Sequence, residues 1–350
     1  MSTFADRLIQ WHKTHGRHRL PWQNSTDPYR IWLSEIMLQQ TQVDTVIPYY
    51  ERFLAQFPDL PSLAHAPAET VMALWSGLGY YARARNLHRA AQIVMTEHNG
   101  IFPHNAQTIA GLPGIGRSTA AAIAAFAYGE RRAILDGNVK RVLCRAFGIE
   151  GFPGDKTVET QLWALAESLL PDGNLATYTQ AQMDLGALLC TRGRPACLHC
   201  PLQDICIAQL ENRTHLLPTP RPKKTIPRRT VHLALIIHQD TVLLERRPPK
   251  GIWGDLFSLP EIPQSTGQAQ DWIFQTLGLT TEPGPAYATI SHTFTHFILD
   301  IHTHSFITTQ PASPPDVPHL HWVPLSGLEQ VGLPAPIRRI LATLQACIPV

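Results

Sequence analysis

The sequence lacks a long hydrophobic run and contains little charge. No apolar stretch approaches the roughly 20 residues that a membrane-spanning helix needs, and the first residues lack the pattern of a secretion signal. Charged residues make up 16% of the 350, too few for extensive disorder, whereas 44% are hydrophobic. We therefore expect a folded protein that is neither exported nor inserted into a membrane. Two domains are the default at this length.

Proline and basic residues are concentrated in one segment. Residues 217–229 contain four prolines, and residues 221–229 carry five basic side chains and no acidic one. Acidic residues outnumber basic ones beyond this point, although the net charge is +2. We predict a linker over 217–229 that separates a domain over 1–216 from a domain over 230–350. From charge alone, contact with nucleic acid and plain solvation are both open.

The two halves differ in hydrophobic periodicity. Asp27 and Pro28 form a helix start, and the pattern predicts a helix from 29 to 46. No clearly alternating strand precedes residue 229. Beyond it, the patterns predict a hairpin over 231–237 and 241–244, a strand region over 292–308, and helices over 268–277 and 335–346. The pattern therefore predicts an all-α domain followed by a smaller mixed α/β domain.

Cysteine is scarce and clustered. Four of the six cysteines have the spacing C-x6-C-x2-C-x5-C: Cys190, Cys197, Cys200 and Cys206. In a chain without a secretion signal, such a cluster favours a metal centre over disulfides. Four thiolates bind either tetrahedral zinc or a [4Fe–4S] cluster. One short C-x2-C pair with two longer arms favours the cluster and leaves zinc open.

A glycine pair joins two expected helices over 105–110 and 117–129. Gly114 and Gly116 lie in the string LPGIGR, where they permit a tight turn and close approach of another backbone. Free N–H groups at the start of the second helix suit a phosphate. An ordinary helix–helix connection is the alternative.

Two carboxylates suggest acid–base chemistry. Glu35 lies in an apolar helical stretch, so we expect burial to raise its pKa and make it a proton donor. A polar strip shared with Ser34 and Gln39 is the alternative. Asp136 precedes a helix, so we expect an N-cap whose pKa is lowered, and a purely structural cap is the alternative. A proton donor and an anion together suit the cleavage of an N-glycosidic bond.

Several longer strings resemble the MutY-type adenine DNA glycosylases of the endonuclease III superfamily. The resemblance covers nearly the whole chain and rests on LPWQ (20–23), PYRIWLSEIMLQQTQV (28–43), LWSGLGYYARARNLH (74–88), LPGIGRSTA (112–120), ILDGNVKRVL (134–143), MDLGALLCTR (183–192) and RPPKGIWGDLFSLPE (247–261). It implies a helix-hairpin-helix glycosylase domain with a [4Fe–4S] cluster loop over 186–208. An α+β Nudix-like domain would follow.

The resemblance also implies a reaction. The enzyme would flip adenine out of double-stranded DNA, opposite 8-oxoguanine or guanine, and release it. Glu35 would protonate the base and then activate water, Asp136 would stabilise the sugar cation, and Asn138 would orient it. Ser118 stands where bifunctional relatives carry a nucleophilic lysine, which implies a monofunctional glycosylase. Scattered acids after Gly251 imply that the second domain does not hydrolyse nucleotides.

Further residues would contact DNA by the same resemblance. The set comprises Leu38, Gln39, Gln40 and Tyr80 around the flipped base, Gly114, Gly116 and Arg117 on the backbone, and Phe294, Thr295 and His296 at 8-oxoguanine. Periodicity alone would assign Leu38 and Tyr80 to core packing. The family loop reads Phe-Ser-His, so Thr295 adds a methyl group at the recognition loop. We expect a monomer, cytoplasmic and associated with the bacterial nucleoid.

Overall fold

The computed structural model describes residues 3–23, 25–222, 225–263, 266–287, 289–294, 296–309 and 319–347. The chain divides into two compact units. The first comprises Met1–His65 and Asn86–Lys223, and the second comprises Ala66–Arg85 and Lys224–Val350. Across these described ranges, no helix has both the length and the apolar character that crossing a bilayer requires.

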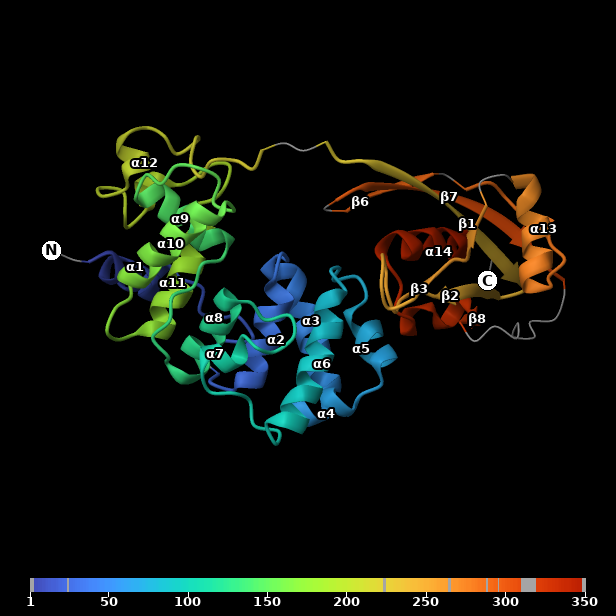
Figure 1. Cartoon of the computed structure of the whole chain (residues 1–350), viewed down its shortest axis with the longest axis horizontal. Helices are drawn as coiled ribbons and strands as arrows, with labels where there is room; N and C mark the ends of the chain where they lie inside the picture. Colours follow the sequence, from blue (N-terminus) through green and yellow to red (C-terminus); the bar gives the residue numbers. More distant parts are fainter. Residues whose placement is uncertain are drawn as a thin grey trace. The chain divides into compact units, whose positions relative to one another are not determined.

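The first unit is helical, which confirms the predicted fold class. Its elements are α1 (Phe4–His15), α2 (Pro28–Leu38), α3 (Val43–Gln56), α4 (Leu60–His65), α6 (Ala82–Glu97, beginning in the second unit), α7 (Ala106–Ile109), α8 (Arg117–Tyr128), α9 (Gly137–Ala146), α10 (Lys156–Ser168), α11 (Leu175–Leu188), the 3-10 helix η1 (Cys197–His199) and α12 (Ile207–Leu210). A shared apolar core joins α1 to α8, α9, α10 and α11 (Figure 1). The cysteine loop packs against the same core.

The predicted helix over 29–46 is interrupted, so that prediction is wrong. α2 ends at Leu38 and α3 begins at Val43. Gln40 lies between them with a φ of 56°. A left-handed residue cannot continue a right-handed helix. The resulting turn leaves Gln40 exposed to solvent.

The second unit contains a mixed sheet. Its strands are β1 (Arg228–His238), β2 (Thr241–Arg246), β3 (Phe257–Ser258), β4 (Glu261–Ile262), β5 (Glu282–Pro283), β6 (Ile290–Thr293), β7 (Ile298–Ile307) and β8 (Leu320–Pro324). β1 pairs in parallel with β7 and antiparallel with β2. The β1–β2 pair confirms the predicted hairpin. The predicted helices correspond to α13 (Thr266–Leu277) and α14 (Ala335–Cys347), and a 3-10 helix η2 (Leu325–Gln330) precedes α14.

The sheet is covered on both faces. Ala234 and Ile236 of β1 share a core cluster with Ile273 of α13. Leu233 and Leu235 alternate with them, so they face the other side, and they are also buried. Figure 1 shows α13 and α14 on different sides of these strands. The middle of β1, residues 233–236, is therefore apolar on both faces.

A segment from the first half of the chain packs within the second unit. It includes α5 (Ala68–Trp75) and the turn that follows. Ser76 Oγ donates to the carbonyl of Leu333 at 2.9 Å and accepts from Arg338 Nη2 at 2.6 Å. Arg85 Nη1 donates to the carbonyl of Gly254 at 2.7 Å. Residues 66–85 are thus tied by specific polar contacts to the loop at Gly254 and to α14 with the segment before it.

Candidate active site

Glu35 faces a cavity of about 490 Å³ in the first unit. Asp27 caps α2 by accepting a hydrogen bond from the backbone N–H of Tyr29 at 2.9 Å. The helix buries Trp32, Leu33 and Ile36 on its other sides, and this packing leaves Glu35 in the cavity wall. Burial, and secondly the charge of Asp136, raises the pKa of Glu35 to about 8. The predicted upward shift is confirmed.

Asp136 caps helix α9, as predicted. Its Oδ1 accepts from the backbone N–H of Val139 at 2.8 Å, and Asn138 Nδ2 lies 3.4 Å from its Oδ2. Burial nevertheless raises the pKa of Asp136, because desolvation outweighs these hydrogen bonds and the nearby Arg141. The prediction of a lowered pKa is therefore wrong.

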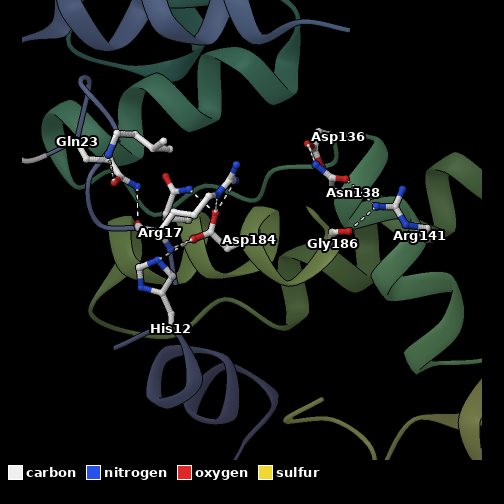
Figure 2. A network of polar contacts seen from close by, with 10 residues as sticks. His12, Arg17, Gln23, Asp136, Asn138, Arg141, Asp184 and Gly186 are labelled. Atoms are coloured by element: carbon white, nitrogen blue, oxygen red, sulfur yellow. Dashed lines mark hydrogen bonds and ion pairs between the residues drawn. The ribbon is translucent and has the colours of Figure 1, made fainter. Parts of the chain in front are cut away.

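Arg141 links the Asp136 region to the start of the cysteine loop. Its Nη2 donates to Asn138 Oδ1 and to the carbonyl of Gly186, each at 2.7 Å. Its Nε donates to the carbonyl of Cys190 at 2.7 Å. Figure 2 shows Arg141 reaching from α9 toward both Asn138 and Gly186. Arg141 thereby links Asn138, in the first turn of α9, to helix α11.

Ser118, which follows the glycine hairpin, supports the segment before Asp136. Ser118 Oγ accepts from the backbone N–H of Leu135 at 2.9 Å. Gly114 has a φ of 78°, and an added Cβ there would lie 2.7 Å from Asn86 Cβ. Gly116 caps α8, and an added Cβ there would meet no atom within 4 Å. The fold thus requires glycine at Gly114, whereas Gly116 leaves open space at the helix start.

The other predicted DNA-contacting residues of the first unit differ in their surroundings. Gln39 Nε2 lies 3.4 Å from Thr119 Oγ1 beside the hairpin, and Leu38 is half-buried. The guanidinium of Arg117 stacks 3.8 Å above the ring of Trp163 and bonds to Glu167. Arg117 is therefore engaged by helix α10.

Sequence reasoning missed a second polar network beside the cavity. Asp184 on α11 accepts from the backbone N–H of Arg17 and from Arg17 Nε, both at 2.7 Å, and from Gln180 Nε2 at 2.9 Å. His12 Nε2 lies 3.3 Å from Asp184 Oδ2 (Figure 2). His12, Arg17 and Gln180 all line the cavity that contains Glu35. The available signal was a polar pair, Gln180 and Asp184, at helical spacing before an apolar run.

The four clustered cysteines line one small cavity in the first unit. Arg145 Nη1 lies 3.4 Å from Cys190 Sγ, and Cys206 Sγ lies 3.4 Å from the carbonyl of Arg145. Burial, and then neighbouring thiols, raises the pKa of Cys200 to about 12. Among the described residues, no three His, Cys, Asp or Glu side chains are arranged to hold a metal ion. Four such thiols would ionise together only if a bound centre supplied positive charge.

Phe294, one of the predicted recognition residues of the second unit, belongs to an aromatic cluster. The Phe294 ring is 4.7 Å from the rings of His292 and Phe297, and 6.1 Å from Trp253. His296 is exposed, and Thr295 lies outside the described residues. Tyr80, in the turn after α5, is 51% exposed and has a φ of 49°. Core packing, the alternative for Tyr80, does not hold.

Family models match both units. The HhH-GPD superfamily of base excision DNA repair proteins matches residues 33–168, and the NUDIX domain matches residues 232–343. A thermostable thymine-DNA glycosylase superposes with a TM-score of 0.55 at 29% identity, over 59% of this chain and 95% of its own. The fold and the site thus define a base excision DNA repair protein with an appended NUDIX-like domain.

Curated relatives define the family. The adenine DNA glycosylase of Buchnera aphidicola subsp. Acyrthosiphon pisum is 38% identical over 97% of this chain and 96% of its own length. That of Mus musculus is 34% identical over 92% of this chain and 74% of its own length. The chain belongs to the adenine DNA glycosylase family, enzymes that hydrolyse N-glycosyl bonds. The predicted resemblance is confirmed.

Proposed function

We propose that this enzyme releases adenine opposite 8-oxoguanine or guanine in double-stranded DNA, by base flipping and without strand cleavage. The observation that carries the proposal is Glu35, a carboxyl with a pKa raised to about 8 in the wall of a 490 Å³ cavity. Such a group holds a proton at neutral pH and can transfer it to a leaving base. The cavity volume suits a base that has been unstacked from the duplex.

Glu35 acts first as the acid and then as the base. Protonation of a ring nitrogen makes adenine a better leaving group and draws electrons from the N-glycosidic bond. The carboxylate that remains then takes a proton from the water that attacks the sugar. Apolar cavity walls, including Trp22, Ile31 and Phe126, keep the carboxyl desolvated until a base enters.

Asp136 stabilises the sugar cation. Its raised pKa in the free protein supports this role, because burial makes its negative charge costly until a cation lies nearby. An oxocarbenium-like sugar would supply that cation in the transition state, so the attraction would be stronger there than in the ground state. Asn138, held by Arg141, keeps the Asp136 carboxylate oriented.

The reaction ends with base release. Ser118 presents a hydroxyl that accepts from Leu135, so no amine is available at this position to attack the sugar. Lys13 also lines the cavity. Borohydride trapping with the wild type and with Lys13→Ala tests the proposal. We expect no high yield of a stable protein–DNA adduct, and abundant trapping in both proteins would contradict a monofunctional mechanism.

We also propose that Cys190, Cys197, Cys200 and Cys206 hold a [4Fe–4S] cluster. All four side chains line one shared cavity, which supports a single bound centre. When bound, the cluster orders the loop that follows α11 and does not itself break the glycosidic bond. Chemical analysis for iron and sulfide, together with the visible absorption spectrum, tests the assignment. We expect both elements and an absorption spectrum typical of iron–sulfur proteins. Stoichiometric zinc without iron would overturn it.

The remaining site residues contact DNA in this proposal. The open backbone at Gly116 approaches a phosphate, with Gly114 and Arg117 shaping the hairpin. The other contacts fill or inspect the mispair: Leu38, Gln39, Gln40, Tyr80, Phe294, Thr295 and His296. We propose a monomer that acts in the cytoplasm on nucleoid DNA, with the domain boundaries at 216 and 230.

One assay tests the substrate. Duplexes carry adenine opposite 8-oxoguanine, guanine or thymine, and control duplexes carry thymine opposite guanine or an oxidised pyrimidine. We expect alkali-dependent nicks in adenine strands opposite 8-oxoguanine and guanine. Cleavage confined to thymine or to oxidised pyrimidines would overturn the proposed specificity.

A further inference from the structure

A buried carboxylate lies behind the cavity and takes no part in the proposed bond breaking. Asp184 has no exposed surface and does not line the cavity. Three residues that do line it, His12, Arg17 and Gln180, converge on Asp184 from α1, the following loop and α11. Figure 2 shows His12 and Arg17 beside Asp184. The carboxylate therefore lies at the point where three parts of the cavity wall meet.

Asp184 fixes the loop that carries Arg17. The carboxylate accepts from the Arg17 backbone N–H and Nε at 2.7 Å each, and Arg17 Nη2 lies 2.6 Å from Oδ1. Gln23 completes the loop, because its Nε2 donates to the Arg17 carbonyl at 2.8 Å and its Oε1 accepts from Leu20 at 3.0 Å. The amide of Gln23 is thus used at both ends within the loop.

The side-chain amide nitrogen of Gln180 already makes a hydrogen bond to Asp184. Gln180 Nε2 donates to Asp184 Oδ1 at 2.9 Å. A carboxylate accepts hydrogen bonds and donates none, so only the NH2 end of the amide can face it. The amide oxygen must then point away from Asp184. Because Gln180 lines the cavity, that oxygen is available as an acceptor for a bound base.

His12 independently indicates a polar ligand in the same cavity. Its side chain is buried, with 5% of its surface exposed, and lines the cavity. Its Nε2 faces Asp184 Oδ2 at 3.3 Å, whereas its Nδ1 has no hydrogen-bond partner among the described residues. A buried polar group without a partner is costly, so a ligand that supplies one is favoured.

We propose that Asp184 is a positioning residue that sets the hydrogen-bond polarity of the base cavity, holding Gln180 with its amide oxygen toward the flipped base. The proposal rests on the function proposed above and names a determinant of its base specificity. An acceptor at this place pairs with the exocyclic amine of adenine. It would oppose the oxygen that hypoxanthine carries at the same position, because two acceptors repel each other.

The test compares adenine with hypoxanthine in Asp184→Asn, Gln180→Leu and the double variant. Equilibrium dialysis of the radiolabelled free bases gives the ratio of their dissociation constants. Single-turnover excision from duplexes with adenine or hypoxanthine opposite 8-oxoguanine gives the ratio of rates. Both ratios are independent of how much of each variant is folded.

We expect the wild type to prefer adenine and Asp184→Asn to reduce the preference by about tenfold, because an asparagine lets the Gln180 amide turn either way. Gln180→Leu should reduce it similarly, and adding Asp184→Asn to Gln180→Leu should change nothing further. Asp172→Asn is the matched control, because it removes an exposed pair with Arg131 outside the cavity and should keep the wild-type ratio.

Three results would overturn the proposal: equal wild-type affinity for both bases, an unchanged preference in Gln180→Leu, or a further loss when Asp184→Asn is added to Gln180→Leu. The Gln180→Leu result decides even if Asp184→Asn does not fold. If the wild type excises no adenine from any duplex, the proposed function fails, and the dialysis ratios still decide the role of Asp184.

Discussion

Two carboxyl groups beside the same cavity have opposite pKa shifts. Burial raises the pKa of Glu35 to about 8, with a further contribution from the charge of Asp136. Asp184 is also buried, and burial alone would raise its pKa too. Hydrogen bonds from His12, Arg17 and Gln180, with the charge of Arg17, instead lower the pKa of Asp184 below its usual range. Depth of burial therefore does not decide the protonation state; the donors around the carboxylate do.

The difference separates a reactive group from a structural one. Glu35 can exchange a proton near neutral pH, which a general acid needs. Asp184 stays ionised over the same range and so presents a constant set of acceptors to the cavity wall. Asp136 shares the direction of Glu35, because its N-cap hydrogen bonds oppose burial without overcoming it and its pKa is raised. The predictions below test each side of this comparison.

The largest expected effect is on catalysis. Glu35→Gln removes the proton donor and Asp136→Asn removes the anion, so each should slow single-turnover adenine release by about a thousandfold or more. Duplex binding, measured by fluorescence anisotropy, should persist in both variants. Normal turnover by either variant would remove that residue from the proposed mechanism.

The next effect is on stability. Asp184→Asn leaves Arg17 without its buried carboxylate, so the free energy of unfolding should fall by about 3 kcal/mol at neutral pH. The pKa of Asp184 is lowered in the folded state, so its contribution is present above the unfolded value near 4 and is lost as pH falls through the folded value. Urea unfolding from about pH 2 to pH 8 measures the difference from the wild type across this window.

Glu35→Gln, measured in the same urea series, should show the opposite dependence of stability on pH. The folded pKa of Glu35 is raised, so the stability that it contributes is present below its unfolded pKa of about 4.5 and is lost as pH rises through about 8. The variant should therefore gain stability relative to the wild type across that window. Parallel pH curves for both variants would contradict the contrast between the two carboxyl groups.

Local sequence patterns predicted the raised pKa of Glu35 but not the network around Asp184. Glu35 lies in an apolar helical stretch, and Asp136 follows a short apolar segment at a helix start, so their elements and the upward shift of Glu35 were predictable. The shift of Asp136 was not, because the extent of its burial depends on how distant helices pack around it. Asp184 was missed for the same reason. Its partners, His12 and Arg17, are more than 160 residues away in the chain.

The turn after α2 shows another limit of local patterns. The stretch from 29 to 46 contains no proline that would break the helix. Pro28 precedes it and Pro48 follows it. The break at Gln40 therefore has no compositional signal. Gln39 contacts Thr119 near the glycine hairpin, and a continuous helix would carry this side chain elsewhere. Tertiary contacts thus override the local helical preference at this point.

A smaller effect concerns the pH dependence of base release. Glu35 acts from its protonated form, so the single-turnover rate should fall about tenfold per pH unit above its pKa of about 8. Asp184 does not titrate in this range because its pKa is lowered. Asp172→Asn, which removes an exposed pair with Arg131, should keep the wild-type profile. A rate that stays constant from pH 7 to pH 10 would exclude Glu35 as the acid.

The smallest effect is expected at Ser118. Its hydroxyl accepts from the backbone N–H of Leu135, directly before Asp136, so Ser118→Ala leaves that N–H unpaired and should lower the free energy of unfolding by about 1 kcal/mol. Because the same contact supports the segment that carries Asp136, base release should slow only a few-fold, measured in single turnover. Ser168→Ala is the matched control and should change neither quantity, because this exposed hydroxyl at the end of α10 bonds only to Leu165 in its own helix. A loss as large as that of Asp136→Asn would mean that Ser118 takes a direct part in the reaction, and the division between reactive and supporting groups would have to be redrawn.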